Sequence, residues 1–372
     1  MRILVVNAGS SSLKLRVLGP DDAIDGTRDL AAPGGRLDEA AVGEAIDGFG
    51  TVDAVGHRIV HGGSRFRAPV RLDAGVVAGL EALVDLAPLH LPKSLTALRL
   101  VGRLLPDVPA VACFDTAFHA DLPAAASTYA LPREWRERWD LRRYGFHGLS
   151  HAYASRRAAE LAGRTAGDGF RVVTCHLGAG ASLAAVLDGR SIDTTMGFTP
   201  LEGLVMATRA GSVDPGLVLW LEEHVRMPPA ELAATLENRA GLLGLAGTAD
   251  MVAVLAGAEA GLPDHRLALD VYLHRLRASI AAMTAALGGL DALVFTGGVG
   301  ERSPAIRAGA AAGLAYLGVA LDPATNAATD AAGAVAADDR EIGAPGAAVR
   351  SFVVASREDL EIARQVRSVL AG

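Results

Sequence analysis

Two short turns of small residues follow apolar runs and have the composition of phosphate-binding loops. Residues 7–12 read Asn-Ala-Gly-Ser-Ser-Ser and lead to Lys14, and residues 176–180 read His-Leu-Gly-Ala-Gly. Glycine lets a ligand approach the backbone closely, and successive backbone N–H groups carry the partial positive charge that suits phosphate. Either turn alone is well explained as a tight hairpin. Their repetition instead favours two sites that together hold one polyphosphate.

A third glycine-rich segment, residues 295–301, follows an apolar strand and precedes a helix expected to begin near Ser303. Phosphate or ribose fits the N-terminus of such a helix, although a structural turn explains the segment equally well. Neither of the first two turns has the spacing of a Walker P-loop or the strand-turn-helix context of a Rossmann fingerprint. A P-loop or Rossmann nucleotide site is therefore disfavoured.

Two arginines and one aspartate have the chemistry to act on a phosphoryl group. Arg58 precedes a glycine pair at 62–63, and Arg209 lies among small residues. A lone arginine usually forms a surface ion pair, but two arginines beside phosphate loops would form a guanidinium clamp. Asp115 ends the apolar run 108–114, where catalytic or magnesium-associated carboxylates are frequent; a helix N-cap is the alternative.

Two other patterns are weaker candidates. His147 and His151 have the i, i+4 spacing of a zinc-binding helix but no H-E-x-x-H motif, so a zinc site is disfavoured. Residues 133–143 interleave arginines with tryptophans, but opposite charges at helical spacing indicate a solvated helix rather than a nucleic-acid patch. The formal charge of -7, from 35 Lys and Arg against 42 Asp and Glu, also disfavours nucleic acid as a partner.

The elements that must position these residues alternate between strands and helices. The strand, small-residue turn and strand of the N-terminus return at 170–186, which indicates a duplicated two-domain fold. We therefore predict an α/β protein with mixed or partly parallel sheets, and a surface loop at 329–348. Apolar runs predict strands at 3–6, 13–17, 108–114, 170–177, 183–187, 191–196 and 292–295, and helical periodicity predicts helices at 75–86, 93–105, 150–162, 215–224, 230–238, 266–287, 303–315 and 358–370.

Length and composition agree with this organisation. A chain of 372 residues suggests two domains, and 51% hydrophobic but only 5% aromatic residues predict a core of aliphatic side chains. Cys113 and Cys175 each lie inside an apolar strand, which favours reduced thiols and a cytoplasmic protein. We expect no signal peptide and no membrane partner, because the apolar stretches are too short to span a bilayer.

Taken in order along the chain, these strings resemble the acetate kinase family of the acetate and sugar kinase, Hsp70 and actin superfamily. The resemblance implies two duplicated actin-like, ribonuclease H-like domains with an active site in the cleft between them. Residues 1–148, joined by the C-terminal helix 358–372, would form one domain, and residues 149–357 would form the nucleotide-binding domain. The resembling strings are residues 7–14, 56–63, 86–92, 113–123, 144–151, 175–182, 199–215, 241–244, 295–301 and 356–364.

The resemblance also implies an activity: reversible transfer of a phosphoryl group from ATP to acetate, giving acetyl phosphate and ADP. Mg²⁺ would be the metal, with Mn²⁺ as a substitute, and the enzyme would be a homodimer. The alternatives are a short-chain acyl kinase that prefers propionate or uses GTP or pyrophosphate, and a non-catalytic nucleotide-binding relative. An acetate carboxylate, with a pKa of about 4, has no proton to lose at neutral pH. Asp115 is therefore expected to orient magnesium or an arginine rather than to act as a base.

Site residues follow from the same resemblance. Those implied to be catalytic are Asp115, His147, Arg209 and Arg58. The acyl group would be bound by Arg58, Val60, Leu89, Phe146 and Pro200, and the metal by Asn7 and Glu358. The nucleotide would be bound by Lys14, His176, Leu177, Gly178, Ala179, Gly180, Asp250, Met251, Val252, Gly298, Val299, Gly300, Glu301 and Arg302.

The chain departs from the family at four positions, all in or beside the nucleotide segments. Ala179 replaces the usual asparagine, Val252 replaces an arginine expected near the adenosine, and Arg302 and Arg357 stand where asparagines are usual. We therefore expect the acyl acceptor to be typical of the family and base recognition to be weaker.

Overall fold

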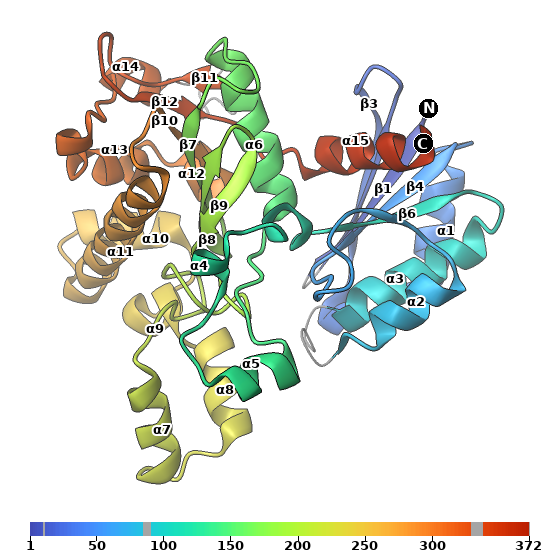
Figure 1. The fold of residues 1–372 in the computed structure, drawn as a ribbon, viewed down its shortest axis with the longest axis horizontal. Coiled ribbons are helices and arrows are strands. Elements are labelled where there is room, and N and C mark those ends of the chain that lie inside the picture. The colour runs from blue at the N-terminus through green and yellow to red at the C-terminus, as the bar shows by residue number, and fades with distance from the viewer. Residues whose placement is uncertain (10–11, 85–90, 329–337, 372) are drawn as a thin grey trace. The chain divides into compact units, whose positions relative to one another are not determined.

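The computed structural model describes residues 1–9, 12–84, 91–328 and 338–371 (Figure 1). They form two compact units. Unit 1 consists of Met1–Ala120, Phe146–Tyr153 and Arg357–Gly372, and unit 2 of Asp121–Gly145 and Ala154–Ser356. Each unit contains a six-stranded mixed sheet with helices packed against it, so the predicted α/β class with mixed sheets is confirmed.

The sheet of unit 1 has the order β3-β2-β1-β4-β6-β5. β1 pairs antiparallel with β2 and parallel with β4, and β4 pairs parallel with β6. The strands are β1 (Ile3–Ala8), β2 (Ser12–Leu18), β3 (Ile24–Ala31), β4 (Ala54–Ile59), β5 (Val70–Arg71) and β6 (Ala110–Phe114).

The sheet of unit 2 has the order β11-β12-β10-β7-β8-β9. β7 pairs antiparallel with β8 and parallel with β10, and β10 pairs parallel with β12, so the connectivity of unit 1 is repeated strand for strand. The duplication predicted from the repeated turns is confirmed. The strands are β7 (Arg171–Leu177), β8 (Ala181–Leu187), β9 (Arg190–Thr194), β10 (Ala292–Thr296), β11 (Arg340–Glu341) and β12 (Arg350–Val353).

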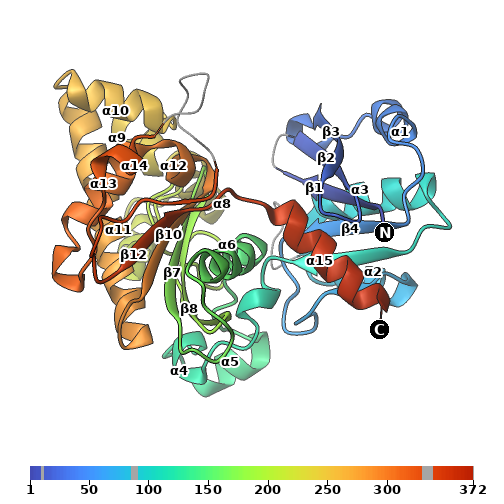
Figure 2. The same cartoon turned by 90° about the horizontal axis from the view of Figure 1, so that it is seen from above.

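Alternation along the strands of unit 1 gives its sheet two apolar faces. Leu4 and Val6 of β1 face the helices α1 and α3, whereas Ile3 and Val5 face α15. This arrangement is visible where α15 lies on one side of the first sheet and α1 and α3 on the other (Figure 2). The helices are α1 (Glu39–Asp47), α2 (Ala74–Glu81), α3 (Leu91–Leu104) and α15 (Glu358–Ala371).

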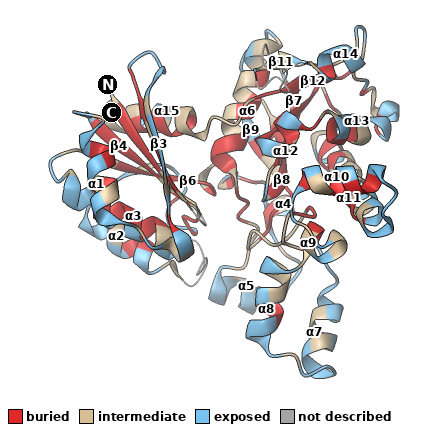
Figure 3. Ribbon diagram, turned by 180° about the vertical axis from the view of Figure 1, so that it is seen from behind, coloured by how far each residue is buried: buried red, intermediate tan, exposed pale blue. Residues whose placement is uncertain are grey.

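Helices of unit 2 differ in burial. The long α11 packs on β7, β8 and β9, whereas α5 and α7 contain no buried residue and colour as largely exposed (Figure 3). The solvated helix predicted from the charges of residues 133–143 is confirmed as α5. α6 (Gly148–Leu161) begins in unit 1 and ends in unit 2. The helices of unit 2 are α4 (Ala124–Ser127), α5 (Arg133–Trp139), α7 (Pro215–Glu223), α8 (Pro229–Asn238), α9 (Gly241–Ala246), α10 (Met251–Glu259), α11 (Pro263–Leu287), α12 (Gly297–Arg302), α13 (Pro304–Ala312) and α14 (Pro323–Asn326).

One apolar stretch, Gly241–Glu259, has the length and composition of a membrane span. It is not one continuous helix. Gly247, at φ 70°, ends α9 in the left-handed conformation, and the side chain of Asp250 caps the N-terminus of α10. The stretch is therefore two short helices joined by a turn.

Residues 121–145 belong to unit 2, although the predicted boundary at residue 148 assigns them to the first domain. Their polar partners explain the difference. Arg143 donates to the carbonyl oxygens of Thr195 and Met196, and Tyr144 N–H donates to Gly197. The segment thus packs with the loop that follows β9.

Candidate active site

Arg58 lies at the centre of the predicted catalytic residues of unit 1. Its Nε and Nη2 donate to the two oxygens of Asp115 at 2.9 and 2.7 Å, and its Nη1 donates to Asn7 Oδ1 at 3.2 Å. Nη1 also lies 3.7 Å from Glu358 Oε2, which accepts a hydrogen bond from Asn7 Nδ2 at 3.2 Å. Three residues, from β1, the end of β6 and the start of α15, thus surround the guanidinium of Arg58 on β4.

Sheet topology explains why these residues lie close together. β1, β4 and β6 are parallel neighbours, so the residues near their carboxyl ends share one edge of the sheet. The first turn of α15, which begins with Glu358, reaches the same edge (Figure 1). Asp115 follows β6 directly and is 1% exposed. Its carboxylate contacts Arg58 with both oxygens.

Burial and the neighbouring charges have opposing effects on the pKa values in this cluster. Burial disfavours the charge of Arg58, but Asp115 and Glu358 outweigh that effect and raise the pKa of the guanidinium. Burial raises the pKa of Glu358, while Arg58 opposes the shift and Asp115 adds to it. A carboxylate in this state gains from a further cation. Arg58 remains charged and keeps N–H groups on Nη1 and Nη2 for an anionic ligand.

His147 is held beside Asp115 through the backbone. Gly148 N–H donates to the carbonyl of Asp115 at 2.9 Å, and His147 has φ 56° in the left-handed region. A Cβ at position 148 would overlap the Asp115 carbonyl, so the chain can approach this closely only with glycine there. A left-handed histidine is a backbone strain of the kind that clusters at functional sites.

The other residues predicted in unit 1 are placed as follows. Phe146 is buried, and its carbonyl lies 3.1 Å from His119 Nε2. Val60 is half-buried just after β4, and Lys14 is the β2 partner of Asn7. Leu89 lies outside the described residues.

Two predicted nucleotide segments of unit 2 lie at the ends of neighbouring strands. His176 of β7 pairs with Thr296 of β10, so the turn after β7 and the start of α12 share one sheet edge. A Cβ on Gly297 would lie 2.8 Å from the carbonyl of Leu177, which shows how closely the two segments approach. Gly178–Gly180 form the tight turn of the β7-β8 hairpin, and residues 298–302 lie within α12. The third segment is therefore itself a helix rather than a turn before one.

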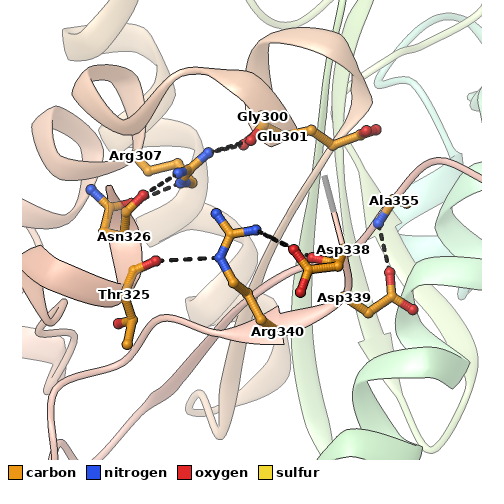
Figure 4. A network of polar contacts seen from close by, with 9 residues as sticks. All are labelled: Gly300, Glu301, Arg307, Thr325, Asn326, Asp338, Asp339, Arg340 and Ala355. Atoms are coloured by element: carbon orange, nitrogen blue, oxygen red, sulfur yellow. Dashed lines mark hydrogen bonds and ion pairs between the residues drawn. The ribbon is translucent and has the colours of Figure 1, made fainter. Parts of the chain in front are cut away.

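A buried arginine fixes the carboxyl end of α12 (Figure 4). Arg307 of α13 is 0% exposed and donates to the carbonyls of Gly300 and Glu301 at 2.8 and 2.7 Å. Its other N–H groups donate to Asn326 Oδ1 and to the Asn326 carbonyl at 2.7 and 2.6 Å. Burial lowers the pKa of Arg307 to about 10, with the charge of Arg340 as a smaller cause. The partial negative charge at the end of α12 offsets part of this cost.

Arg209 lies in a loop of unit 2 that touches the turn after β7. The carbonyl of Ala179 accepts a hydrogen bond from Ala207 N–H at 3.1 Å. Arg209 Nη1 donates to the carbonyl of Pro200 at 3.3 Å, and its Nε lies 3.9 Å from Glu237 Oε1. Burial lowers the pKa of Arg209, and Glu237 opposes that shift. The structure thus brings Pro200, Arg209 and the second glycine-rich turn together.

The other predicted nucleotide residues of unit 2 lie at the start of α10: Asp250 is its N-cap, and Met251 and Val252 are its first two residues. α10 packs on α11, and α11 packs on β8. Val252 is 73% exposed. Of the other departures from the family, Arg302 is exposed and Arg357 bonds to Asp359 at 2.9 Å.

Several residues that contact the predicted site residues, or the segments that carry them, belong to no recognisable sequence motif. Glu237, which pairs with Arg209, lies in α8 with no motif around it, and Arg307 reads as an ordinary helix cation. The same holds for Tyr129 and Glu202, which hold the loop carrying Pro200. Only spatial contacts identify them.

The predicted metal residues fit a magnesium ion in chemistry. Asn7 and Glu358 are hydrogen-bonded to each other and offer oxygen donors, which Mg²⁺ prefers. Across the part of the chain that the structure describes, no cluster of three or more His, Cys, Asp or Glu side chains is arranged around a metal position. A site with one or two protein oxygens is usual for Mg²⁺ that also binds substrate phosphates.

The duplicated fold, together with the match to a family of kinases, gives the class of the protein: it is a kinase. A model of the acetokinase family matches residues 35–364, so the chain belongs to the acetokinase family. An acetate kinase of Leifsonia xyli is 45% identical over 100% of this chain and 99% of the relative. The crystal structure of Porphyromonas gingivalis acetate kinase has a TM-score of 0.88 at 33% identity, and that of a propionate kinase from Francisella tularensis 0.89 at 32%; each comparison covers 99% of both chains.

Proposed function

We propose that the protein transfers a phosphoryl group reversibly between ATP and acetate, with acetyl phosphate and ADP as products. The observation that supports this most directly is the placement of Arg58. It is oriented by both oxygens of Asp115 and is surrounded by Asn7 and Glu358, so its remaining N–H groups are available to an anion. Membership of the acetokinase family supports the same activity.

The chemistry requires positioning and charge neutralisation rather than proton transfer. An acetate oxygen attacks the γ-phosphorus in line, the bond from that phosphorus to the β-bridging oxygen breaks, and ADP leaves with the bond's electrons. Acetate is already ionised at neutral pH, so no base is needed. Arg58 would bind the acyl carboxylate or the transferring phosphoryl group, and Asp115 would keep the guanidinium in the productive orientation.

Other roles rest on the family resemblance. His147 would donate to the transferring phosphoryl group, and its left-handed backbone next to Asp115 supports a constrained position. Arg209 would contribute positive charge to the same group. Asn7 and Glu358 would hold Mg²⁺, which would neutralise phosphate charge when bound. The glycine-rich turn after β7 and the start of α12 would bind the nucleotide phosphates through backbone N–H groups.

The acyl acceptor and the phosphoryl donor can be tested in one assay. Acyl phosphate is trapped with hydroxylamine as the hydroxamate, with acetate and propionate as acceptors and ATP, GTP and pyrophosphate as donors. We expect acetate with ATP to give the highest kcat/KM, with propionate second. A preference for propionate would change the acceptor, use of pyrophosphate but not ATP would change the donor, and no hydroxamate with any pair would overturn the proposal.

We also propose a cytoplasmic homodimer. Cys113 and Cys175 are buried free thiols, as suits a reducing compartment. Burial raises the pKa of both thiols, which favours the neutral thiol over the reactive thiolate. Exposed apolar side chains on α7, among them Leu217, Leu219 and Trp220, offer a surface that a second copy would cover.

A further inference from the structure

Outside the predicted site, the carboxylate of Glu202 joins two other side chains of unit 2. Tyr129 Oη donates to Glu202 Oε2 at 2.6 Å, and Arg143 Nη2 donates to Glu202 Oε1 at 2.7 Å. The Arg143 guanidinium also lies over the Tyr129 ring, 5.6 Å from its centre. Burial raises the pKa of Tyr129, and the hydrogen bond to Glu202 adds to the shift, so the phenol stays protonated and donates.

These side chains also bond to the backbone of the loop that follows β9. Arg143 Nη1 donates to the carbonyls of Thr195 and Met196 at 3.2 and 3.1 Å, and Tyr129 Oη accepts from Phe198 N–H at 2.9 Å. Between these contacts, the Gly197 carbonyl accepts from the N–H groups of residues 144 and 145. Each residue from 195 to 198 is therefore held through its backbone. We call Tyr129, Arg143 and Glu202 the loop clamp.

The side chains of the loop clamp pack closely against Gly197. A Cβ on Gly197 would overlap both Tyr129 Oη and Glu202 Oε2. Both atoms take part in the hydrogen bonds of the clamp, so neither can move aside without breaking a contact. These contacts therefore require glycine at position 197.

The loop held by the clamp carries the carbonyl oxygen that accepts a hydrogen bond from Arg209. Pro200 lies between Phe198, which Tyr129 holds, and Glu202, which the clamp holds by both oxygens. Its carbonyl accepts from Arg209 Nη1 at 3.3 Å, while the nearest carboxylate, Glu237, is 3.9 Å away. A small shift of Pro200 would therefore change where the Arg209 guanidinium points.

We propose that Tyr129, Arg143 and Glu202 are positioning residues that fix the guanidinium of Arg209 for phosphoryl transfer through the loop 195–202. The proposal rests on the proposed function, because it takes Arg209 to act on the phosphoryl group. Displacement of a positioned group by about 1 Å can cost roughly 10²-fold in rate. Substrate contacts made elsewhere would be untouched.

The first experiment compares two phenol deletions. Tyr129→Phe removes the hydroxyl that joins Glu202 to Phe198, whereas Tyr272→Phe removes a buried hydroxyl without a hydrogen-bond partner among the described residues. We expect Tyr129→Phe to lower kcat by roughly 10- to 100-fold with little change in the KM for ATP. Tyr272→Phe should retain the wild-type kcat. Equal kcat values in the two variants would overturn the proposal.

A double-mutant cycle tests whether the effect passes through Arg209. Tyr129→Phe is measured again in an Arg209→Lys background, and its effect on kcat should largely vanish there. The same fold-change in both backgrounds would overturn the proposal, because the clamp would then act only on the general structure of unit 2.

Amide hydrogen exchange tests whether the loop clamp holds the loop, independently of any enzyme activity. In Tyr129→Phe, residues 195–202 should exchange faster, while the strands of the second sheet should keep their wild-type rates. Unchanged exchange at 195–202 would overturn the clamp whatever the kinetics show. If the wild-type protein forms no acyl phosphate, the proposed function fails, and the exchange measurement still decides whether the clamp holds the loop.

Discussion

Arg58 and Asp115 form a two-contact ion pair in which Nε meets Oδ1 at 2.9 Å and Nη2 meets Oδ2 at 2.7 Å. They come from parallel neighbouring strands, because Arg58 pairs with Cys113 in the register of β4 and β6. Two parallel contacts fix the plane of the guanidinium as well as its position. The ion pair therefore fixes the direction of the Arg58 N–H groups that face away from Asp115.

Asp115→Asn should damage both stability and rate. The amide retains the shape of the carboxylate but leaves Arg58 partly buried without its main counter-charge, and breaking a buried pair typically costs about 3 to 5 kcal/mol. We expect a loss of that size in the free energy of unfolding by urea. We also expect a fall in kcat of roughly 10²- to 10³-fold, because the guanidinium is no longer oriented.

A surface pair provides the control for this variant. Asp29 bonds to Arg16 but is 54% exposed, so Asp29→Asn should change stability by less than about 1 kcal/mol and leave kcat unchanged. Equal losses of stability in the two variants would show that the Asp115 pair has no special role.

Arg209→Ala should lower kcat far more than it raises the KM for ATP. An arginine that stabilises a phosphoryl-transfer transition state is worth about 10³ to 10⁵ in rate. Steady-state kinetics with acetate and ATP give both constants, and a urea titration checks that the variant is folded. An unchanged kcat would remove Arg209 from the catalytic residues.

Val252→Arg should sharpen the preference for ATP over GTP. Val252 is 73% exposed at the start of α10, so an arginine fits there without repacking. A planar cation stacked on the base would contribute about 0.5 to 2 kcal/mol. We expect a lower KM for ATP and a larger ATP to GTP ratio of kcat/KM. Strong discrimination in the wild type would instead show that another group reads the base.

Acidification should destabilise the protein through two buried histidines. Burial lowers the pKa of His57 and His119 to about 4, against 6.5 as the ordinary value. Between pH 6.5 and 4 the unfolded chain binds more protons than the folded one, so stability falls as the pH falls through this window. Each histidine contributes up to about 1.4 kcal/mol per pH unit there.

The slope is measured by urea unfolding between pH 6.5 and 5, where carboxylates contribute least. His57→Gln, which cannot take up a proton, should flatten the slope relative to wild type even if it is less stable at every pH. A variant slope equal to that of wild type would show that His57 does not titrate in the folded state below its ordinary pKa.

Trp220→Glu should convert the proposed dimer to monomers. Trp220 and Leu219 on α7 are 50% and 55% exposed, and a charge among buried apolar contacts at an interface is strongly unfavourable. Sedimentation velocity gives the oligomeric state. Trp139→Glu on α5 is the control, because Trp139 is equally exposed at 50%. Dimers that survive Trp220→Glu would place the interface elsewhere.

Local sequence patterns were sufficient for the fold and for part of the candidate site. Apolar runs mark strands such as β1 and β7 because both faces of each sheet are buried, and the repeated small-residue turns mark the duplication. Glycine-rich turns and the residues that end apolar strands are also visible locally. The family resemblance added the proposed metal-binding roles of Asn7 and Glu358.

Long-range contacts and short polar elements were not predictable in this way. Glu202 meets Tyr129 across 73 residues, and neither residue belongs to a motif. Residues 295–301 read as a turn because glycine disfavours helices, yet α12 forms there because Arg307 holds its last carbonyls. β3 (Ile24–Ala31) lacks an apolar run because most of its side chains are exposed, so only its pairing with β2 identifies it.

The packing of α15 has a consequence for synthesis of the chain. Ile362 and Val366 fill the space beside Gly56 in β4, where a Cβ would overlap Ile362, and they cover Ile3 and Val5 of β1. On a ribosome, α15 is synthesised only after the rest of unit 1 and the whole of unit 2. Unit 1 therefore cannot complete its core until α15 has been translated, and until then its apolar face must stay exposed or be shielded by a chaperone.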